Sequence, residues 1–148
     1  MIKAEDLRIG DLVRVREMKT CRFIPKDVAY KVTRINPNKN LLINNRSSVC
    51  LCLANPKQKQ TEWPMSCGSL LPIPLTPKIL EKNGFEIREG TVAYAKNRLA
   101  LKPLDEGKGY QVGLGSLRLF YIEVRIVNYV HELQHILWVL GEDANLKI

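Results

Sequence analysis

Residues 7–16 read LRIGDLVRVR, and this stretch establishes the fold class of the first half of the chain. It contains a Gly-Asp pair, which is typical of a turn, followed by alternating apolar and basic side chains. Because successive side chains of a β-strand point to opposite faces, the alternation predicts a half-buried strand with one basic face.

Three further segments of the first half are rich in apolar, β-branched or aromatic residues, which favours strands at residues 28–35, 41–43 and 48–53. Polar turn residues at 36–40 separate the first two of these. Short strands joined by polar turns predict a small antiparallel sheet or barrel of the SH3-like kind. The proline-rich residues 56–74 are predicted to form a connector.

The second half combines helices with strands. Thr76 as N-cap and Pro77 as first residue predict the start of a short helix, and Asn83-Gly84 predicts its end. A last helix is expected from Tyr129 to Leu140, with Asn128 as N-cap and Gly141 at its end. Antiparallel strands, with connections too short for helical crossovers, are expected at residues 85–88, 91–95, 98–101, 110–114 and 117–127.

These elements predict an α+β protein. Its parts are a basic β-subdomain at residues 1–55, the connector at 56–74 and an α+β subdomain at 75–148, and all of them could form one continuous domain. A chain of 148 residues with 45% hydrophobic content can bury a modest core. No apolar run approaches the ~18 residues of a membrane span, and the N-terminus lacks the apolar segment of a cleaved signal. We therefore expect a cytoplasmic protein without a membrane partner.

Positive charge is concentrated in the first half of the chain. Residues 1–74 carry 13 basic and 6 acidic side chains, whereas residues 75–148 carry 10 and 9. A basic segment attracts polyanions, nucleic acid above all, through a long-range and salt-sensitive field. We therefore expect nucleic acid or another phosphate-bearing ligand to bind at Arg14, Arg16, Lys31 and Arg34. A charged face that serves only solubility is the alternative.

Two other patterns favour structural explanations. The glycines at residues 107–115 are similar to a phosphate-binding loop, but Gly107-Lys108 is not followed by Ser or Thr, so a hairpin turn is favoured. Among the cysteines, Cys50 and Cys52 form a C-x-C pair, while Cys21 and Cys67 stand apart. This spacing favours free thiols in a reducing compartment over a zinc site made of four thiolates.

Residues 131–135 read HELQH, which matches the zinc-hydrolase motif H-E-x-x-H. In that motif His131 and His135 would bind zinc from one helix face, and Glu132 would be the general base. Helical periodicity, however, places both histidines opposite the apolar face, and the chain has no third histidine. Glu142 and Asp143 are the nearest downstream candidates for a third ligand, but they lie beyond the predicted end of the helix at Gly141. We therefore expect no catalytic residue, no metal and no cofactor.

Trp138 and Val139 fall on the flank of the same outward helix face. An exposed aromatic side chain indicates a contact surface for a partner or for a second copy of the chain. Packing of Trp138 on the N-terminal sheet is the alternative. Trp138 is thus the candidate contact of a protein-binding module or of an inhibitor of a host factor.

Three stretches together resemble a known family: residues 7–13 (LRIGDLV), 73–86 (IPLTPKILEKNGFE) and 128–144 (NYVHELQHILWVLGEDA). They are similar to small uncharacterised proteins of gut bacteria and their phages, whose pattern is LRIGN-V, PIPLTEEWLLKFGF and YVHQLQNLYFALTGEEL. In the last stretch the matching positions are Tyr129, Val130, His131, Leu133, Gln134 and Gly141.

The resemblance departs from the family pattern at two positions, because Glu132 and His135 stand where the family has Gln and Asn. It therefore implies that H-E-x-x-H is incidental in this chain and that His131 has a packing or contact role. It also implies a phage, prophage or mobile-element context. Together these observations predict a non-enzymatic accessory protein that binds nucleic acid or a phosphate-bearing ligand. A protein-binding module is the alternative, and a zinc hydrolase is the third hypothesis.

Overall fold

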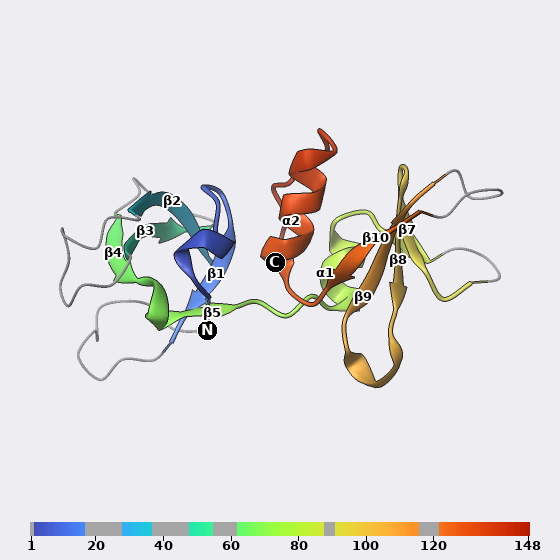
Figure 1. Cartoon of the computed structure of the whole chain (residues 1–148), viewed down its shortest axis with the longest axis horizontal. Helices are drawn as coiled ribbons and strands as arrows, with labels where there is room; N and C mark the ends of the chain where they lie inside the picture. Colours follow the sequence, from blue (N-terminus) through green and yellow to red (C-terminus); the bar gives the residue numbers. More distant parts are fainter. Residues whose placement is uncertain (1, 17–27, 37–47, 55–61, 88–90, 116–121) are drawn as a thin grey trace. The chain divides into compact units, whose positions relative to one another are not determined.

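The structure of the chain is a computed structural model that describes residues 2–16, 28–36, 48–54, 62–87, 91–115 and 122–148 (Figure 1). The chain forms two compact units, Met1–Ile73 and Pro74–Ile148. Each unit contains a five-stranded antiparallel sheet, and the second also contains both described α-helices. The α+β class predicted from the sequence is confirmed. The strand predicted at residues 41–43 and the thiol of Cys21 lie outside the described residues.

The first unit is one antiparallel sheet with strand order β4-β3-β2-β1-β5. The fifth strand returns to pair with the first, which is the order of an SH3-like barrel. Single 3-10 turns occur at Ala4–Asp6 and at Cys67–Ser69, between the last two strands. The strands are β1 (Leu12–Val15), β2 (Tyr30–Asn36), β3 (Ser48–Leu53), β4 (Trp63–Ser66) and β5 (Leu70–Pro72).

The proline-rich segment differs from the expected connector. Residues 63–72 contain β4 and β5, which pair with β3 and β1. Prolines fit here because β4 and β5 are the two edge strands of the sheet, where a missing N–H removes no ladder hydrogen bond. The boundary between the units consequently lies after Ile73, and β4 and β5 belong to the first unit.

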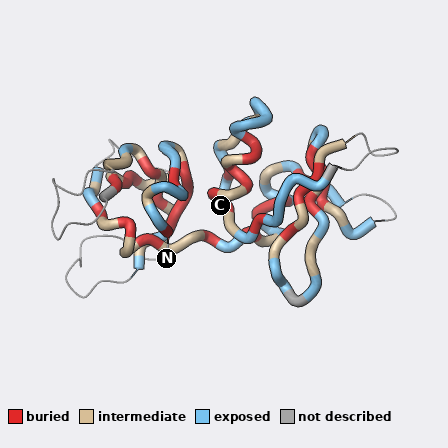
Figure 2. The backbone as a smooth tube through the Cα atoms, viewed as in Figure 1, coloured by how far each residue is buried: buried red, intermediate tan, exposed pale blue. Residues whose placement is uncertain are grey.

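The core of the first unit lies on one face of this sheet. Val13, Tyr30, Val32 and Leu51 are almost wholly buried there. Figure 2 shows the buried segments of the backbone in red. Tyr30 makes an edge-to-face contact with Trp63, with ring centroids 5.9 Å apart. Such aromatic pairs add to the hydrophobic stabilisation of burial.

The predicted turn before β1 is present and holds the strand in register. Gly10 adopts a positive φ of 101°, which favours glycine. Its N–H donates to the carbonyl of Val32 at 2.8 Å, and the N–H of Val32 donates to the carbonyl of Asp11 at 2.9 Å. The buried carboxylate of Asp11 accepts the N–H of Arg8 at 2.7 Å, so the Gly-Asp pair joins the start of β1 to the middle of β2.

The second unit is an antiparallel meander with strand order β10-β9-β8-β7-β6, preceded by α1 and followed by α2. The predicted hairpin at the glycine-rich segment is confirmed, because β8 and β9 pair directly across it. Its elements are α1 (Pro77–Lys82), β6 (Glu86–Ile87), β7 (Tyr94–Lys96), β8 (Leu99–Pro103), a 3-10 turn (Asp105–Gly107), β9 (Tyr110–Leu114), β10 (Ile122–Val127) and α2 (Val130–Val139).

The ends of α1 agree with the sequence prediction. The hydroxyl of Thr76 accepts the N–H of Ile79, Pro77 is the first helical residue, and Gly84 has a φ of 78°. Leu80 and Phe85 are buried on the inner side of the unit. The short helix is therefore fixed by its caps and by two apolar anchors.

The start of α2 differs from the prediction by one residue. Its N-cap is Tyr129, not Asn128, and Gly141 follows its end with a φ of 71° as expected. Leu140, the C-cap residue of α2, is 39% exposed. Among the described residues no helix has the length and apolar character needed to cross a membrane.

Candidate functional site

The predicted basic site includes Lys31 and Arg34, and a bulge in β2 places both on one face of the first sheet. Lys31 pairs with Cys52 and Arg34 pairs with Cys50, with a register shift between Val32 and Arg34. Directly opposed residues of antiparallel strands share a face, and so do residues two apart in one strand. Since Cys50 and Cys52 are two apart, Lys31 and Arg34 share the face opposite the core.

The residue that creates the bulge is Thr33, which has no directly opposed partner on β3. Its hydroxyl donates to the carbonyl of Cys50 at 3.2 Å. In a regular strand Lys31 and Arg34, three positions apart, would point to opposite faces. The extra residue reverses that outcome.

The two remaining basic residues follow from the register of β1. Leu12 pairs with Lys31, so Arg14, two positions further along β1, lies on the same face. Arg16 follows the end of the strand with its backbone N–H donating to the carbonyl of Ser69 at 2.8 Å. Three of the four predicted residues therefore lie on strands of one sheet and share its outer face, and Arg16 directly follows β1.

The four basic side chains differ in exposure. Arg14, Arg16 and Arg34 are exposed, whereas Lys31 is half-buried. Leu12, Lys31 and Cys52 form a row across the middle of this face, and the residues on either side of Lys31 are buried: Leu12 is 5% exposed and Cys52 is 1% exposed. The three exposed arginines consequently lie around this largely buried row and do not form a continuous exposed surface.

Arg34 is already neutralised by an acidic side chain. Its Nε donates to Glu62 Oε2 at 3.1 Å, and its Nη2 donates to the same oxygen. These hydrogen bonds from Arg34 are the main reason that the pKa of the Glu62 carboxyl is lowered, and a hydrogen bond from Thr33 adds to the effect. No such pair involves Arg14 or Arg16 among the described residues, so these two are the stronger candidates for an anionic ligand.

The described cysteines are free thiols of unequal accessibility. Cys52 and Cys67 are buried, and burial raises the pKa of both thiols. Cys50 is half-buried. A raised pKa leaves less of the reactive thiolate, so Cys52 and Cys67 have the character of structural residues. The described residues contain no group of three or more His, Cys, Asp and Glu side chains arranged to hold a metal ion.

The two histidines of HELQH do not lie on an outward face of α2, contrary to the prediction. His131 is 5% exposed and His135 is half-buried. The ring of His131 stacks on that of Tyr129 and meets the ring of His135 edge to face, with centroids 5.9 Å and 6.0 Å apart. The prediction was wrong because the buried face of α2 is wider than its apolar residues alone indicate and also includes the polar residues His131 and Gln134.

Glu132 is occupied at the start of the same helix. Its Oε2 accepts the backbone N–H groups of Asn128 and Tyr129 at 2.7 Å and 3.1 Å. A carboxylate in this place binds N–H groups that have no partner within the helix and offsets the positive end of the helix dipole. Glu132 thus acts as a helix cap, and its carboxylate is turned to the backbone and away from the general-base role of the motif.

Trp138 is 67% exposed at the last turn of α2. Val139 is equally exposed and Leu140 follows at 39%, so three consecutive apolar side chains are open to solvent. Exposed aromatic residues are common in the centres of protein interfaces.

Sequence reasoning missed two features, the pairing of Arg34 with Glu62 and the bulge at Thr33. Both depend on contacts between segments that are far apart in the sequence, and no local sequence pattern predicts them. Comparison of the chain with protein-family models, curated proteins and solved structures gives no significant match.

Proposed function

We propose that the chain is a non-enzymatic accessory binding protein that recognises nucleic acid through the basic face of its first unit. The observation that carries this proposal is the exposure of Arg14 in β1 and of Arg16 just after it, two positions apart and without an acidic partner among the described residues. Their Cα atoms are about 6–7 Å apart along an extended chain, a spacing comparable to that of neighbouring phosphates of one strand.

The charge distribution supports the same ligand class. The first half of the chain carries the excess of 13 basic over 6 acidic side chains. Lys31 contributes from the same sheet face, while Arg34 is compensated by Glu62 and contributes less. Contacts of this kind bind the phosphate backbone without reading base sequence. The phage or mobile-element context of the proposal rests on the resemblance of the three sequence stretches.

The test is binding of short single- and double-stranded oligonucleotides to the full chain over a range of salt concentrations. The proposal expects the logarithm of the binding constant to fall linearly with the logarithm of the salt concentration. Absent binding, or binding insensitive to salt, contradicts it.

A second candidate function is that of a protein-binding module or of an inhibitor of a host factor. It is favoured by the exposed run Trp138, Val139 and Leu140. If this function holds, Trp138→Ala loses the partner while the fold stays intact. Retention of every partner by the folded variant contradicts it. The zinc-hydrolase hypothesis is not proposed, because Glu132 is engaged as a helix cap.

A further inference from the structure

The last residues of the chain, Ala144–Ile148, are held in the second unit mainly through their backbone. This tail has no regular secondary structure. It starts with a tight turn: the carboxylate of Asp143, just before the tail, accepts the N–H of Asn145 at 2.9 Å, and the N–H of Leu146 donates to the carbonyl of Ala144 at 3.0 Å. The tail therefore presents a turn followed by Leu-Lys-Ile.

The side chain of Asn83, the C-cap of α1, both accepts a hydrogen bond from the tail backbone and donates one to it. Its Oδ1 accepts the N–H of Lys147 at 2.8 Å, and its Nδ2 donates to the carbonyl of Lys147 at 2.8 Å. The same Nδ2 donates to the carbonyl of Ile79 at 2.7 Å, which fixes the orientation of the amide from within the helix. Lys96 Nζ donates to the backbone carbonyl of Asn83 at 2.9 Å. The carbonyl of Ile79 thus orients the side-chain amide of Asn83, and Lys96 holds the backbone of the same residue.

Two more side chains bind tail carbonyls. Lys82 Nζ donates to the carbonyl of Ile148 at 2.6 Å, and Gln134 Nε2 donates to the carbonyl of Ala144 at 2.9 Å. Gln134 is only 5% exposed, so its amide is a buried polar group on α2 that serves this segment. Asn83, Lys82 and Gln134 together bind backbone groups at both ends of the tail.

The tail contributes a single buried side chain. Leu146 is 8% exposed, whereas Asn145 and Lys147 on either side are exposed. Backbone hydrogen bonds combined with one apolar anchor are the features by which proteins bind peptide segments, with the backbone giving affinity and the pocket giving specificity.

We propose that Asn83, Lys82 and Gln134 form a binding site for a short peptide segment of another protein, with a leucine-like anchor, and that the tail is its built-in occupant. The tail follows α2 after the short link at residues 141–143, so it competes with a partner as a tethered ligand at an effective concentration on the order of millimolar. The site opens when the partner segment displaces the tail. This inference is independent of the nucleic-acid proposal, because all of its residues belong to the second unit.

The first experiment uses the full chain with Leu146→Ser, which removes the anchor and leaves the backbone intact. The probe is a labelled synthetic peptide with the sequence of residues 142–148, and binding is followed by fluorescence anisotropy. The L146S chain is expected to bind the peptide at least tenfold more tightly than the wild-type chain, whose site is occupied. A peptide with serine in place of its leucine is expected to bind at least tenfold more weakly.

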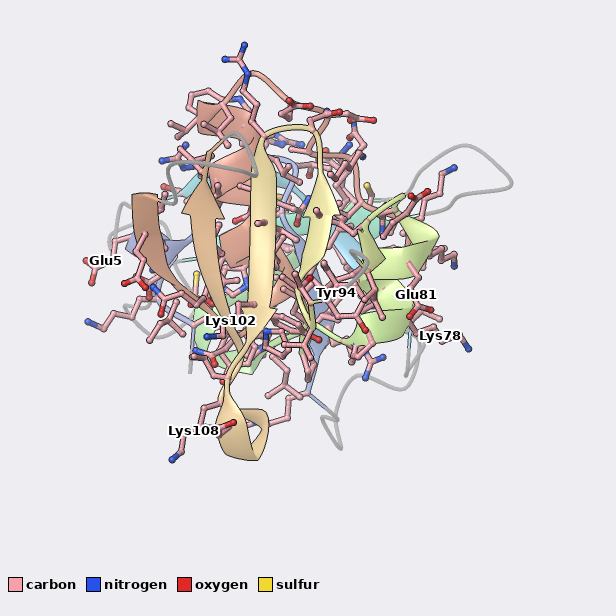
Figure 3. The ribbon with its side chains drawn as sticks, turned by 90° about the vertical axis from the view of Figure 1, so that its right-hand side faces the viewer. Glu5, Lys78, Glu81, Tyr94, Lys102 and Lys108 are labelled. Carbon is pink, nitrogen blue, oxygen red and sulfur yellow. The ribbon has the colours of Figure 1, made fainter. Side chains whose placement is uncertain are left out.

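Two variants in the L146S chain locate the site. Asn83→Ala is expected to abolish peptide binding, while Lys78→Ala, an exposed position on the same helix (Figure 3), leaves binding unchanged. Failure of the folded L146S chain to bind the peptide overturns the proposal. So does a wild-type dimer that becomes a monomer with L146S, since the site would then serve exchange of tails between two copies.

A second measurement decides the matter if L146S does not fold. Hydrogen exchange of the wild-type chain is followed by NMR for the amide of Lys147 and for the core amides of Leu80 and Val112. A tail that opens on its own exchanges at least tenfold faster than the core, with little dependence on denaturant. Exchange of Lys147 at the same rate as the core means that the tail opens only on unfolding, and that result overturns the proposal.

Discussion

Lys31 and Arg34 share one face of β2 although they are three positions apart, because Thr33 is an extra residue of β2 between them, while their partners Cys52 and Cys50 are only two positions apart on β3. The bulge brings Arg34 onto the face that bears Arg14 and Lys31. On that face Glu62 neutralises Arg34, so the charge available to a ligand lies toward Arg14 and Arg16.

The double variant Arg14→Ala/Arg16→Ala is expected to weaken oligonucleotide binding and to reduce the salt dependence. Each lost phosphate contact lowers the slope of the logarithmic salt plot by about 1. Fluorescence anisotropy at several salt concentrations measures the slope. Lys102→Ala is the control, since it removes one positive charge from an exposed position of the second unit (Figure 3). An equal loss of slope per charge in the control would show that only net charge matters.

Glu62→Gln is expected to change how the stability of the first unit depends on pH. The pKa of Glu62 is lowered by Arg34 from its ordinary value of 4.5, so its ionised form stabilises the folded state. That contribution is complete above the ordinary pKa and is lost as the pH falls through the lowered one. Urea denaturation of wild type and E62Q is therefore expected to differ near neutral pH and to converge in acid. A constant difference at all pH values contradicts the pairing.

Glu132→Ala is expected to destabilise the second unit by about 1 kcal/mol, because two backbone N–H groups at the start of α2 lose their acceptor. Glu132→Gln keeps an acceptor but loses the charge near the helix N-terminus, and its expected cost is about 0.3–1 kcal/mol. Far-UV circular dichroism during urea denaturation measures both. Equal stability of wild type and E132A would remove the capping role.

Gly109→Ala is expected to cost at least about 2 kcal/mol, since it combines a strained backbone with overpacking. Gly109 has a φ of 95°, and an added Cβ would lie 2.5 Å from the carbonyl oxygen of Val127. Gly84→Ala is the matched control, with a φ of 78° and open space around the new Cβ. Its expected cost is about 1 kcal/mol, from the backbone alone. Thermal denaturation of both variants gives the comparison, and a lower cost for G109A than for G84A contradicts it.

Trp138→Ala is expected to change the stability of the second unit by less than about 0.5 kcal/mol, because an exposed side chain loses little burial. Leu133→Ala, a fully buried position of the same helix, is expected to cost about 2–5 kcal/mol. A large loss of stability in W138A would show that Trp138 packs against the protein and is not an open contact surface.

Local sequence signals predicted the elements whose ends are set by the chain's own caps and turns. The start of α1 at Pro77 and the turn at Gly10 are examples, because each depends on neighbouring residues only. Local sequence signals gave the wrong secondary structure where pairing with a distant segment determines it. The proline-rich residues 63–72 became edge strands because β3 and β1 offer them partners.

The candidate site was predictable in its residue types but not in its arrangement. The basic residues Arg14 and Arg16 were found from alternation alone, whereas the compensation of Arg34 by Glu62 joins residues 28 positions apart. His131 and Gln134 are buried although both are polar, and the bond from Gln134 to Ala144 depends on where the tail returns. Periodicity describes one helix, and it carries no information about its neighbours.

The edge-to-face contact of Trp63 with Tyr30 gives the chain an internal optical reporter. The sequence contains 2 tryptophans, and each unit holds one of them. Trp138 is 67% exposed and Trp63 is half-buried, so unfolding changes the surroundings of Trp63 more than those of Trp138. Most of the red shift during denaturation is therefore expected from Trp63, and the intrinsic fluorescence of the unlabelled chain reports mainly the melting of the first unit.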